Sequence, residues 1–413
     1  MAAGLRPVLL SLMVGACGAE TEAPRALVER ADSAGIEVVR VLGAPPDTVR
    51  MGSPAVRIGS TGIGGAEHEV FELLSDLAVL PGGRVAVVDN RGARVAVFDS
   101  TGQWRYDLGR RGEGPGEYRA PSHASVRADT LFVWDALGRR LLRYADDGTF
   151  LGARMMPDRA SAHPFAALAD GYLFEVESGQ LMDPAPARAA LVRADRDGEP
   201  VDTLVGPYPV PEYGWQVIDE ESGTGAMTNP PALSVRPRWT VAAGGLYRLD
   251  PEAATIEVRT LDAAAVDPSV RRPTRIVRLP YEASPPSLRD REAYFRALEA
   301  GVDVPEEVIA RERAATEFVA LRPPVADLRV DDRGRLWVAG HDPAAPRRSH
   351  VAAGWDVIDI DRADAVHVEF PDGFELKAVR DGRAYGITTL ETAVHVVDVF
   401  RLPGTPPMSA RVD

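Results

Sequence analysis

Hydrophobic and polar residues alternate in short segments along most of this chain, and two of these segments repeat each other. The segment "GGRVAVVDNRGARVAVFDSTGQW" aligns without a gap with "ADTLFVWDALGRRLLRYADDGTF". Asp89 matches Asp135 and Gly92 matches Gly138, and each matched pair is 46 residues apart. Alternation with period two is typical of β-strands, and glycine and aspartate between such segments indicate turns. The chain therefore contains a repeated unit of short strands.

The repeat predicts the fold class. Each unit contains about four strands, and its turn-then-strand signature recurs six times, at Gly83, Asp129, Gly171, Gly244, Gly334 and Gly382. A period near 45 residues lies in the range of propeller blades. We therefore predict an all-β protein with a six-bladed β-propeller. An array of two-sheet sandwiches is the alternative, and it explains the regular period less well.

The ring needs closure, because an open seam leaves unpaired strand edges. The last unit, Phe374 to Leu402, shows only three clear strands, whereas Ile36 to Val41 in "GIEVVRVLG" forms a spare one. We predict that Ile36 to Val41 pairs with the final blade. The N-terminal strand would then close a propeller that spans residues 35–413.

Two insertions interrupt the repeat. Residues 206–236 are rich in Pro, Gly and Glu, which predicts a long surface loop. Residues 285–318 are predicted to form a helical hairpin, in which Ser287 caps the first helix and Pro305 begins the second. This hairpin is expected either to cover or pack beside the propeller, or to be a helical excursion with no ligand role.

The N-terminus has the layout of an export signal. In "MAAGLRPVLLSLMVGAC", a basic residue precedes a short apolar run and small residues, and the run is too short for a permanent membrane helix. The ending "VGAC" resembles a bacterial lipobox. This resemblance implies a lipoprotein signal peptide over residues 1–17, a lipidated Cys17, a flexible tether over residues 18–34 and attachment to the cell envelope, at the outer membrane with a periplasmic or surface location. An ordinary signal peptide with an incidental cysteine is the alternative.

Net charge and cysteine content limit the classes of binding partner and the covalent cross-links that can be expected. The formal net charge is −14, whereas binding to nucleic acid requires a basic surface, so nucleic acid is not expected as a partner. Cys17 is the only cysteine, so disulfides are not expected in the folded part. The expected partners are the membrane, through the lipid anchor, and a protein, peptide or glycan ligand.

The glycine-rich stretch "LGRRGEGPGEYRAP" at residues 108–121 raises the question of a phosphate-binding loop. A dinucleotide fingerprint requires a helix after the glycines, and a P-loop requires Gly-Lys-Ser/Thr. Here prolines and a new strand follow, and the lysine is absent. We therefore interpret the stretch as the crossover between the first two blades.

The run "G-R-x-G-E-G-P-G-E-Y", followed by "L-F-V-W-D…R-L-L-R-Y…D-G", resembles six-bladed propeller lipoproteins of environmental and gut bacteria, which are related to the NHL-repeat and TolB-like propellers. The resemblance is sharp in the first two blades and holds in pattern for the others. It implies the propeller fold and a location outside the cytoplasm. Members of this group mostly have no assigned activity.

Candidate site residues follow from the register of the inner strands. Counting back seven residues from each of the six turn positions gives Asp76, Ser122, Pro164, Pro237, Asp327 and Glu375. If these positions begin the inner strands, Asp76, Asp327 and Glu375 converge on the propeller axis. Carboxylate oxygens suit Ca²⁺ or Mg²⁺. The alternative is that these carboxylates are solvated residues at strand starts.

Two positions further on, the same strands carry Ala78, Ala124, Ala166, Trp239, Arg329 and Lys377. Trp239, Arg329 and Lys377 are candidates for binding an anionic or aromatic ligand, although packing between blades explains the alanines equally well. Lys377 is the only lysine in the chain.

No motif points to a specific reaction. The sequence lacks an H-x-H or HExxH pair for zinc and a G-x-S-x-G elbow for a serine nucleophile. We therefore predict a non-catalytic, lipid-anchored binding scaffold that needs no cofactor. The alternative is a metal-dependent hydrolase or lyase of the lactonase-like propeller type that uses Ca²⁺ or Mg²⁺. An accessory subunit of an envelope complex is a third possibility.

Overall fold

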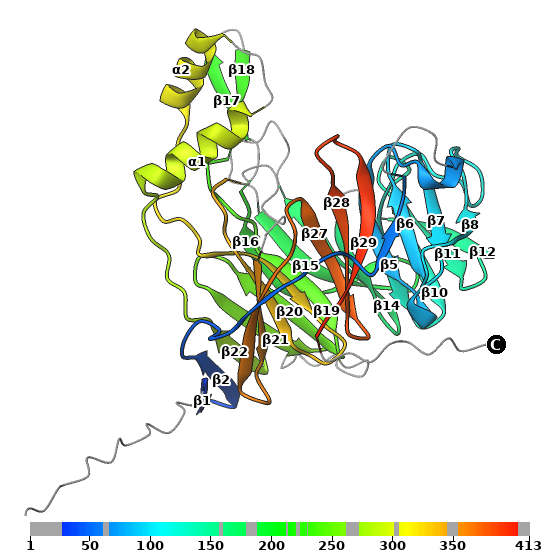
Figure 1. Ribbon diagram of the computed structural model, residues 1–413, viewed down its shortest axis with the longest axis horizontal. Helices are drawn as coiled ribbons and strands as arrows, with labels where there is room; N and C mark the ends of the chain where they lie inside the picture. The colour runs from blue at the N-terminus through cyan, green and yellow to red at the C-terminus, as the bar shows by residue number, and fades with distance from the viewer. Residues whose placement is uncertain are drawn as a thin grey trace, which may run out of the picture.

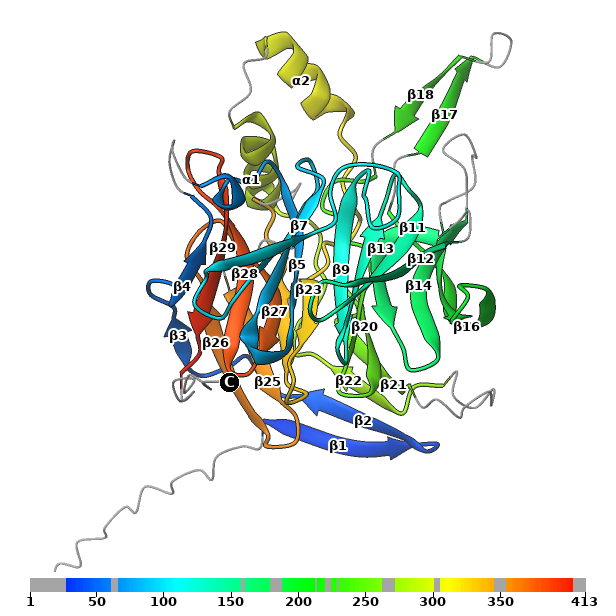
Figure 2. The ribbon, with the colours of Figure 1, turned by 90° about the vertical axis from the view of Figure 1, so that its right-hand side faces the viewer.

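The computed structural model of the protein describes residues 27–60, 66–156, 160–178, 188–211, 214–219, 224–228, 230–261, 272–300, 305–344 and 354–403. Most of these residues lie in six sheets that are built mainly of antiparallel strand pairs. The first strand of each sheet contacts the first strand of the next, and β27 (Phe374–Arg380) of the last sheet contacts β5 (Leu74–Val79) of the first. Six sheets in a closed ring form a six-bladed β-propeller (Figures 1 and 2), which confirms the predicted fold class.

The blades are numbered in chain order, and each begins with its inner strand. Blade 1 contains β5, β6 (Val85–Asp89), β7 (Arg94–Phe98) and β8 (Trp104–Leu108). Blade 2 contains β9 (Pro121–Arg127), β10 (Thr130–Asp135), β11 (Arg140–Ala145) and β12 (Phe150–Met155). Blade 3 contains β13 (Ala160–Ala167), β14 (Gly171–Ser178), β15 (Arg188–Asp195) and β16 (Pro200–Pro209).

The second half of the ring follows the same plan. Blade 4 contains β19 (Arg238–Ala242), β20 (Gly245–Asp250), β21 (Thr255–Thr260) and β22 (Arg275–Arg278). Blade 5 contains β23 (Val325–Val330), β24 (Leu336–Gly340), β25 (Gly354–Asp359) and β26 (Asp364–Glu369). Blade 6 contains β27, β28 (Arg383–Thr389) and β29 (His395–Arg401). All six turn positions predicted from the sequence lie at the connection between the first and second strands of a blade.

The 46-residue repeat is explained by Asp89 and Asp135, each at the end of the second strand of its blade. Each carboxylate accepts hydrogen bonds from two successive backbone N–H groups of the loop that enters the blade, and from the glycine three residues later. A Cβ at Gly92 would lie 2.4 Å from the Asp89 carboxylate, and a Cβ at Gly138 would lie 2.1 Å from that of Asp135. The aspartate and glycine therefore recur together. The aspartate carboxylate fastens the loop, and the glycine, which has no Cβ, leaves room for that carboxylate.

The glycine-rich stretch at residues 108–121 connects β8 to β9, as expected for a crossover between blades. Tyr118 is fully buried within it, and the Tyr144 hydroxyl donates to the carbonyl of Gly116 at 3.1 Å. The guanidinium of Arg140 donates to the carbonyl of Glu117 at 2.7 Å. The crossover is thus held by the blade that it enters.

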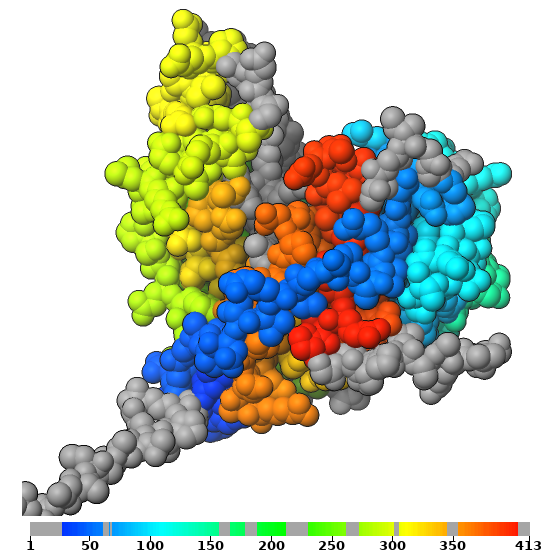
Figure 3. All heavy atoms as spheres, in the orientation of Figure 1, coloured from blue at the N-terminus to red at the C-terminus, as the bar shows by residue number. Residues whose placement is uncertain are grey.

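The N-terminal segment completes the outer edges of three blades in succession. β2 (Ile36–Val41) pairs in parallel with β22 and carries β1 (Val28–Ser33) at its outer edge, and β3 (Thr48–Arg50) pairs in parallel with β26. Only β4 (Val56–Ile58) pairs with β29 of the final blade. Figure 3 shows this blue segment crossing the orange and red blades.

The prediction that Ile36 to Val41 closes the final blade is therefore wrong, although an N-terminal strand does close it. Arg57 in β4 donates two hydrogen bonds of 2.7 Å to Asp398 of β29, and Ile58 is buried where blades 6 and 1 meet. Val39 and Val41 are instead buried between blades 4 and 5. The predicted tether over residues 18–34 ends in β1, whereas Cys17 and the predicted signal peptide lie outside the described residues.

The two insertions lie at one end of the ring. The helical hairpin is confirmed, with α1 (Leu288–Glu299) capped by Ser287 and α2 (Glu306–Ala315) following Pro305. Residues 206–236 are not wholly a loop, because β17 (Gly214–Asp219) and β18 (Thr224–Thr228) form a hairpin within them. Both insertions project from the ring on the side opposite β1 and β2 (Figures 1 and 2). The remaining elements are two short 3-10 helices, Glu67–Glu69 and Pro81–Gly83.

Candidate functional site

The inner strands β5, β9, β23 and β27 each carry a β-bulge near their start. The unpaired residues are Ser75 in β5, Ser122 in β9, Ala326 in β23 and Lys377 in β27. A bulge inserts one residue without a partner and redirects the neighbouring side chains, and bulges are frequent beside binding sites. The bulges therefore interrupt the strict alternation of inner and outer positions where the inner strands begin.

A cavity of about 530 Å³ lies on the propeller axis at this level. Residues from all six inner strands line it, which places it at the centre of the ring. The polar lining residues are Ser75, Asp76, Ser122, His123, Ser125, Arg238, Thr240, Asp327, Arg329, Glu375 and Lys377. The apolar lining residues are Ala124, Ala166, Trp239 and Val241. We call this space the axial cavity.

Asp76 is held between blades 1 and 2. Its Oδ2 lies 2.5 Å from Nδ1 of His123 and accepts the backbone N–H of Ala124 at 3.0 Å. Burial opposes ionisation of this carboxyl, but the charge and hydrogen bond of His123, the charge of Lys377 and the Ala124 N–H outweigh it. Together they lower the pKa of Asp76 to about 2, so this carboxylate is ionised at neutral pH.

Glu375 and Lys377 form an ion pair at the seam between blades 6 and 1. The Lys377 ammonium also donates to the carbonyl of Ser75 at 3.0 Å. These contacts use two of the three donors of the ammonium group. The only lysine of the chain therefore joins the last blade to the first while its side chain lines the axial cavity.

Asp327 is fully buried, and only one of its carboxylate oxygens is occupied. Oδ1 accepts a hydrogen bond from Arg329 at 2.7 Å and lies 4.0 Å from the guanidinium of Arg238 on blade 4. Oδ2 has no hydrogen-bond partner among the described residues. A buried carboxylate oxygen without a partner is costly, so its presence beside a cavity indicates a place for a ligand donor.

Three further polar atoms of the cavity wall are buried and lack a hydrogen-bond partner within the described part of the chain. They are Oγ of Ser75, Oγ of Ser122 and Nε1 of Trp239. Native proteins satisfy most buried polar groups, so unsatisfied groups that gather around one cavity require an explanation. Together with Oδ2 of Asp327, they are buried donors and acceptors, without partners among the described residues, on side chains that line the axial cavity.

The structure brings together all six candidate residues predicted from the sequence. Asp76, Asp327 and Glu375, and likewise Trp239, Arg329 and Lys377, line the axial cavity. Each of the three carboxylates contacts a basic side chain. Within the described residues, no group of three or more His, Cys, Asp or Glu side chains is arranged to hold a metal ion. The Ca²⁺ or Mg²⁺ site stays a prediction.

Sequence reasoning missed Ser75, His123 and Arg238 as cavity residues. Counting every second residue assumes regular alternation, whereas the bulges in β5 and β9 turn consecutive residues toward the axis. Arg238 stands next to the predicted Trp239 at the start of β19. A search for polar residues adjacent to the predicted positions would have found all three.

Comparisons with known proteins support the fold. The model of the family DUF5128, described as a 6-bladed beta-propeller, matches residues 71–208, which is the region of blades 1 to 3. No curated protein matches the sequence. Among solved structures, a protein from Bacteroides fragilis assigned as exported is 11% identical, with a TM-score of 0.50, and the match covers 88% of this chain and 99% of that one.

Two further solved structures match with lower TM-scores. A gluconolactonase from Xanthomonas campestris is 13% identical with a TM-score of 0.40, and the match covers 86% of this chain and 98% of that one. The calcium-binding protein regucalcin from Agrobacterium tumefaciens is 9% identical with a TM-score of 0.39, over 87% of this chain and 98% of that one. Similarity at this level concerns the fold and does not transfer an activity.

Proposed function

We propose that this protein is an exported, lipid-anchored propeller that binds a ligand in its axial cavity without transforming it. The observation that carries the proposal is the set of buried polar atoms without partners on the cavity wall, which includes Oδ2 of Asp327 and Nε1 of Trp239. A bound ligand that pairs with these atoms recovers the hydrogen bonds that the fold leaves unmade.

The charges of the cavity favour a ligand with no net charge. Three carboxylates and three permanently charged bases line it, and the closest contacts of each carboxylate are with bases of the wall itself. An added unpaired charge would therefore be desolvated without gaining a counter-charge. Hydroxyl groups both donate and accept, so they match a wall that offers Asp327 Oδ2 as an acceptor and the Trp239 N–H as a donor.

We therefore propose a neutral sugar unit, free or at the end of a glycan, as the ligand. A volume of about 530 Å³ lies within the usual range for small-molecule sites. The candidate partners predicted from the sequence are glycans, peptides and proteins. An ordinary peptide carries charged termini or side chains that this wall does not match.

Saturation-transfer NMR of the full chain with a panel of neutral hexoses, amino sugars and uronic acids tests this function. We expect neutral hexoses to receive saturation, and Trp239→Phe, which removes the cavity N–H, to weaken the binding. Trp104→Phe is the matched control, because the N–H of Trp104 bonds to Asp107 on the outer strand of blade 1. No transfer to any neutral sugar, or equal effects of the two variants, overturns the proposal.

The competing hypothesis of a metal-dependent hydrolase or lyase requires Asp76, Asp327 and Glu375 to face a common ion. The contacts of these carboxylates with His123, Arg329 and Lys377 favour a binding function instead. Measuring the melting temperature of the protein as Ca²⁺ or Mg²⁺ is added distinguishes the enzyme hypothesis from the binding scaffold. A metal-dependent rise that Glu375→Gln abolishes would support the enzyme and contradict the binding scaffold.

The proposed location rests on Cys17 and the signal-like segment before it. A protein from Bacteroides fragilis that is assigned as exported is among the solved structures with a similar fold. In the described part of the chain, no helix is long and apolar enough to cross a membrane. We expect the full chain to incorporate a labelled fatty acid and to fractionate with membranes, and Cys17→Ser to lose both properties. An unlabelled wild-type chain would refute the lipid anchor and leave the ligand proposal intact.

A further inference from the structure

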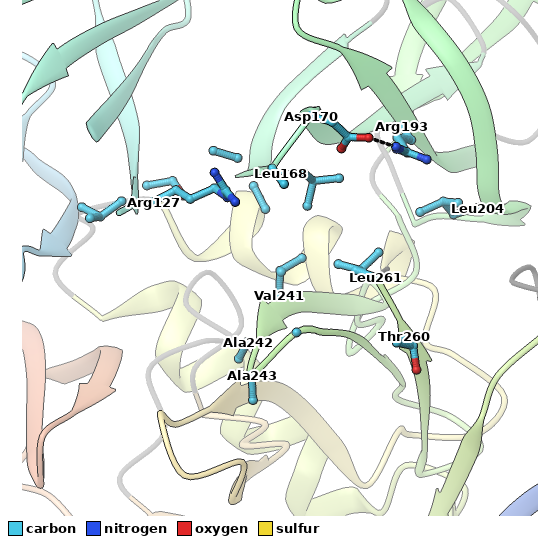
Figure 4. A pocket seen from close by; sticks show the side chains of 16 residues that line it. Arg127, Leu168, Asp170, Arg193, Leu204, Val241, Ala242, Ala243, Thr260 and Leu261 are labelled. Carbon is cyan, nitrogen blue, oxygen red and sulfur yellow. Dashed lines mark hydrogen bonds and ion pairs between the residues drawn. The ribbon is translucent and has the colours of Figure 1, made fainter. Parts of the chain in front are cut away.

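A second hollow opens among blades 2, 3 and 4, at the end of the propeller where their inner strands β9, β13 and β19 end, and Figure 4 shows the side chains that line it. Its volume is about 340 Å³. It shares only Ser125, Ala166 and Val241 with the axial cavity, so the two spaces adjoin along the axis. We call it the lower hollow.

Ten of the sixteen residues that line the lower hollow are alanine, valine or leucine, and polar atoms contribute nearly half of its surface. Its larger apolar side chains are half-buried and come from blades 2, 3 and 4: Val126, Leu168, Leu204, Val241 and Leu261. Leu168, Leu204, Val241 and Leu261 also pack against the buried cluster between blades 3 and 4. Their other sides face the hollow. A hollow that exposes several leucine and valine side chains is suited to a hydrocarbon group.

Two arginines, Arg127 and Arg193, line the lower hollow. Figure 4 shows the side chain of Arg127 extending from the end of β9 toward the middle of the hollow. No ion pair or hydrogen bond to the Arg127 guanidinium is present within the described ranges of the chain. The second arginine of the wall differs, because Arg193 is paired with Asp170.

We propose that the lower hollow binds a single-chain amphiphilic carboxylate, with its hydrocarbon chain against the aliphatic wall and its carboxylate on Arg127. Arginine matches a carboxylate with two parallel N–H donors. The charge of the protein as a whole is −14, so an anion gains attraction here only from the local guanidinium. The combination of an aliphatic wall and one unpaired guanidinium fits an amphiphilic anion better than a neutral sugar.

Calorimetric titration of the full chain with octanoate, decanoate and dodecanoate tests the apolar part of this site. Each added methylene is expected to tighten binding by about fourfold while the chain still fits the hollow. Decan-1-ol and decyltrimethylammonium test the charge. We expect decanoate to bind more tightly than both; equal or tighter binding of the ammonium compound overturns the proposal, since it would show adsorption without recognition of the carboxylate.

Variants locate the binding. Arg127→Gln is expected to weaken the binding of decanoate by about fivefold, because an exposed ion pair contributes only modestly to affinity. The affinity for decan-1-ol is expected to stay unchanged. Arg333→Gln is the matched control, because Arg333 is an exposed arginine in the corresponding turn of blade 5 and does not line the hollow. Equal effects of the two substitutions refute the role of Arg127.

Filling the hollow provides an independent check. Ala242 lines the lower hollow and does not line the axial cavity, so Ala242→Trp is expected to abolish decanoate binding and to preserve sugar binding. Decanoate binding that persists in a folded Ala242→Trp protein places the ligand elsewhere. Because the sugar readout is separate, failure of this site and failure of the proposed function are distinguishable.

Discussion

The Oδ1 atom of Asp135 accepts the backbone N–H of Ala120 at 2.8 Å, across the junction between the loop that enters blade 2 and the end of its second strand. The same carboxylate accepts the N–H groups of Arg119 and Gly138 and contacts the guanidinium of Arg140. It is fully buried. One side chain thus satisfies the backbone where a new blade begins.

Asp135→Ala is expected to lower the free energy of unfolding by about 3 kcal/mol, because it leaves buried N–H groups without an acceptor. Asp129→Ala, in an exposed turn of the same blade, is the control and is expected to change stability by less than about 0.5 kcal/mol. Urea unfolding followed by tryptophan fluorescence measures both. Similar losses in the two variants would show that Asp135 does not fasten the loop.

Gly138→Ala is expected to destabilise the protein, because the added Cβ would lie 2.1 Å from the Asp135 carboxylate. Gly52→Ala is the matched control, because a Cβ at Gly52 has no neighbour within 4 Å. Melting temperatures of the two variants provide the measurement. A Gly138→Ala protein as stable as Gly52→Ala would contradict the steric explanation of the repeat.

Closure of the ring depends on the pair between Arg57 and Asp398. Asp398 is buried and also accepts the hydroxyl of Thr388, so Arg57→Met leaves its charge without a cation. We expect the free energy of unfolding to fall by about 2 to 3 kcal/mol. This is less than for a fully buried pair, because Arg57 is partly exposed to solvent. Arg50→Met removes an exposed pair with Glu369 and is expected to cost less than about 1 kcal/mol. Equal losses would argue against β4 as the closing strand.

Asp76 predicts a dependence of stability on acid. The pKa of Asp76 in the folded protein, about 2, lies below its ordinary value of 3.8. The ionised carboxylate therefore stabilises the folded protein fully above pH 3.8. This contribution, of about 2 kcal/mol, is lost as the pH falls from 3.8 toward 2. The difference in unfolding free energy between wild type and Asp76→Asn should therefore shrink over this range. A constant difference would show that the carboxylate is not specifically stabilised in the fold.

Much of the fold was predictable because local chemistry repeats with it. Asp135 and Gly138 must keep their spacing to fasten a loop, and Ser287 must precede Asp290 by three residues to cap a helix, so both left a visible pattern. The closing strand did not. Its partner is chosen by Arg57 and Asp398, which are 341 residues apart, whereas alternation in Ile36 to Val41 identifies a strand without identifying its neighbour.

The axial cavity was predictable in part for a similar reason. Counting from the turns located Asp76, Asp327 and Lys377, because the inner strands have similar lengths. The same count gave no sign that Lys377 bonds across the seam to Ser75 or that one oxygen of Asp327 lacks a partner. Such facts arise from the packing of one blade against another and have no local pattern.

Ser122 offers the most direct test of the binding function. Ser122 lines the axial cavity. Its hydroxyl is buried and makes no hydrogen bond among the residues that the structure describes, so replacing it with alanine removes no hydrogen bond of the free protein. Calorimetric titration of a neutral hexose into wild type and Ser122→Ala is the measurement. We predict an unchanged or higher melting temperature for Ser122→Ala, about fivefold weaker sugar binding, and recovery of the sugar unaltered. Equal affinity in both proteins, or conversion of the sugar to a product, would contradict the account.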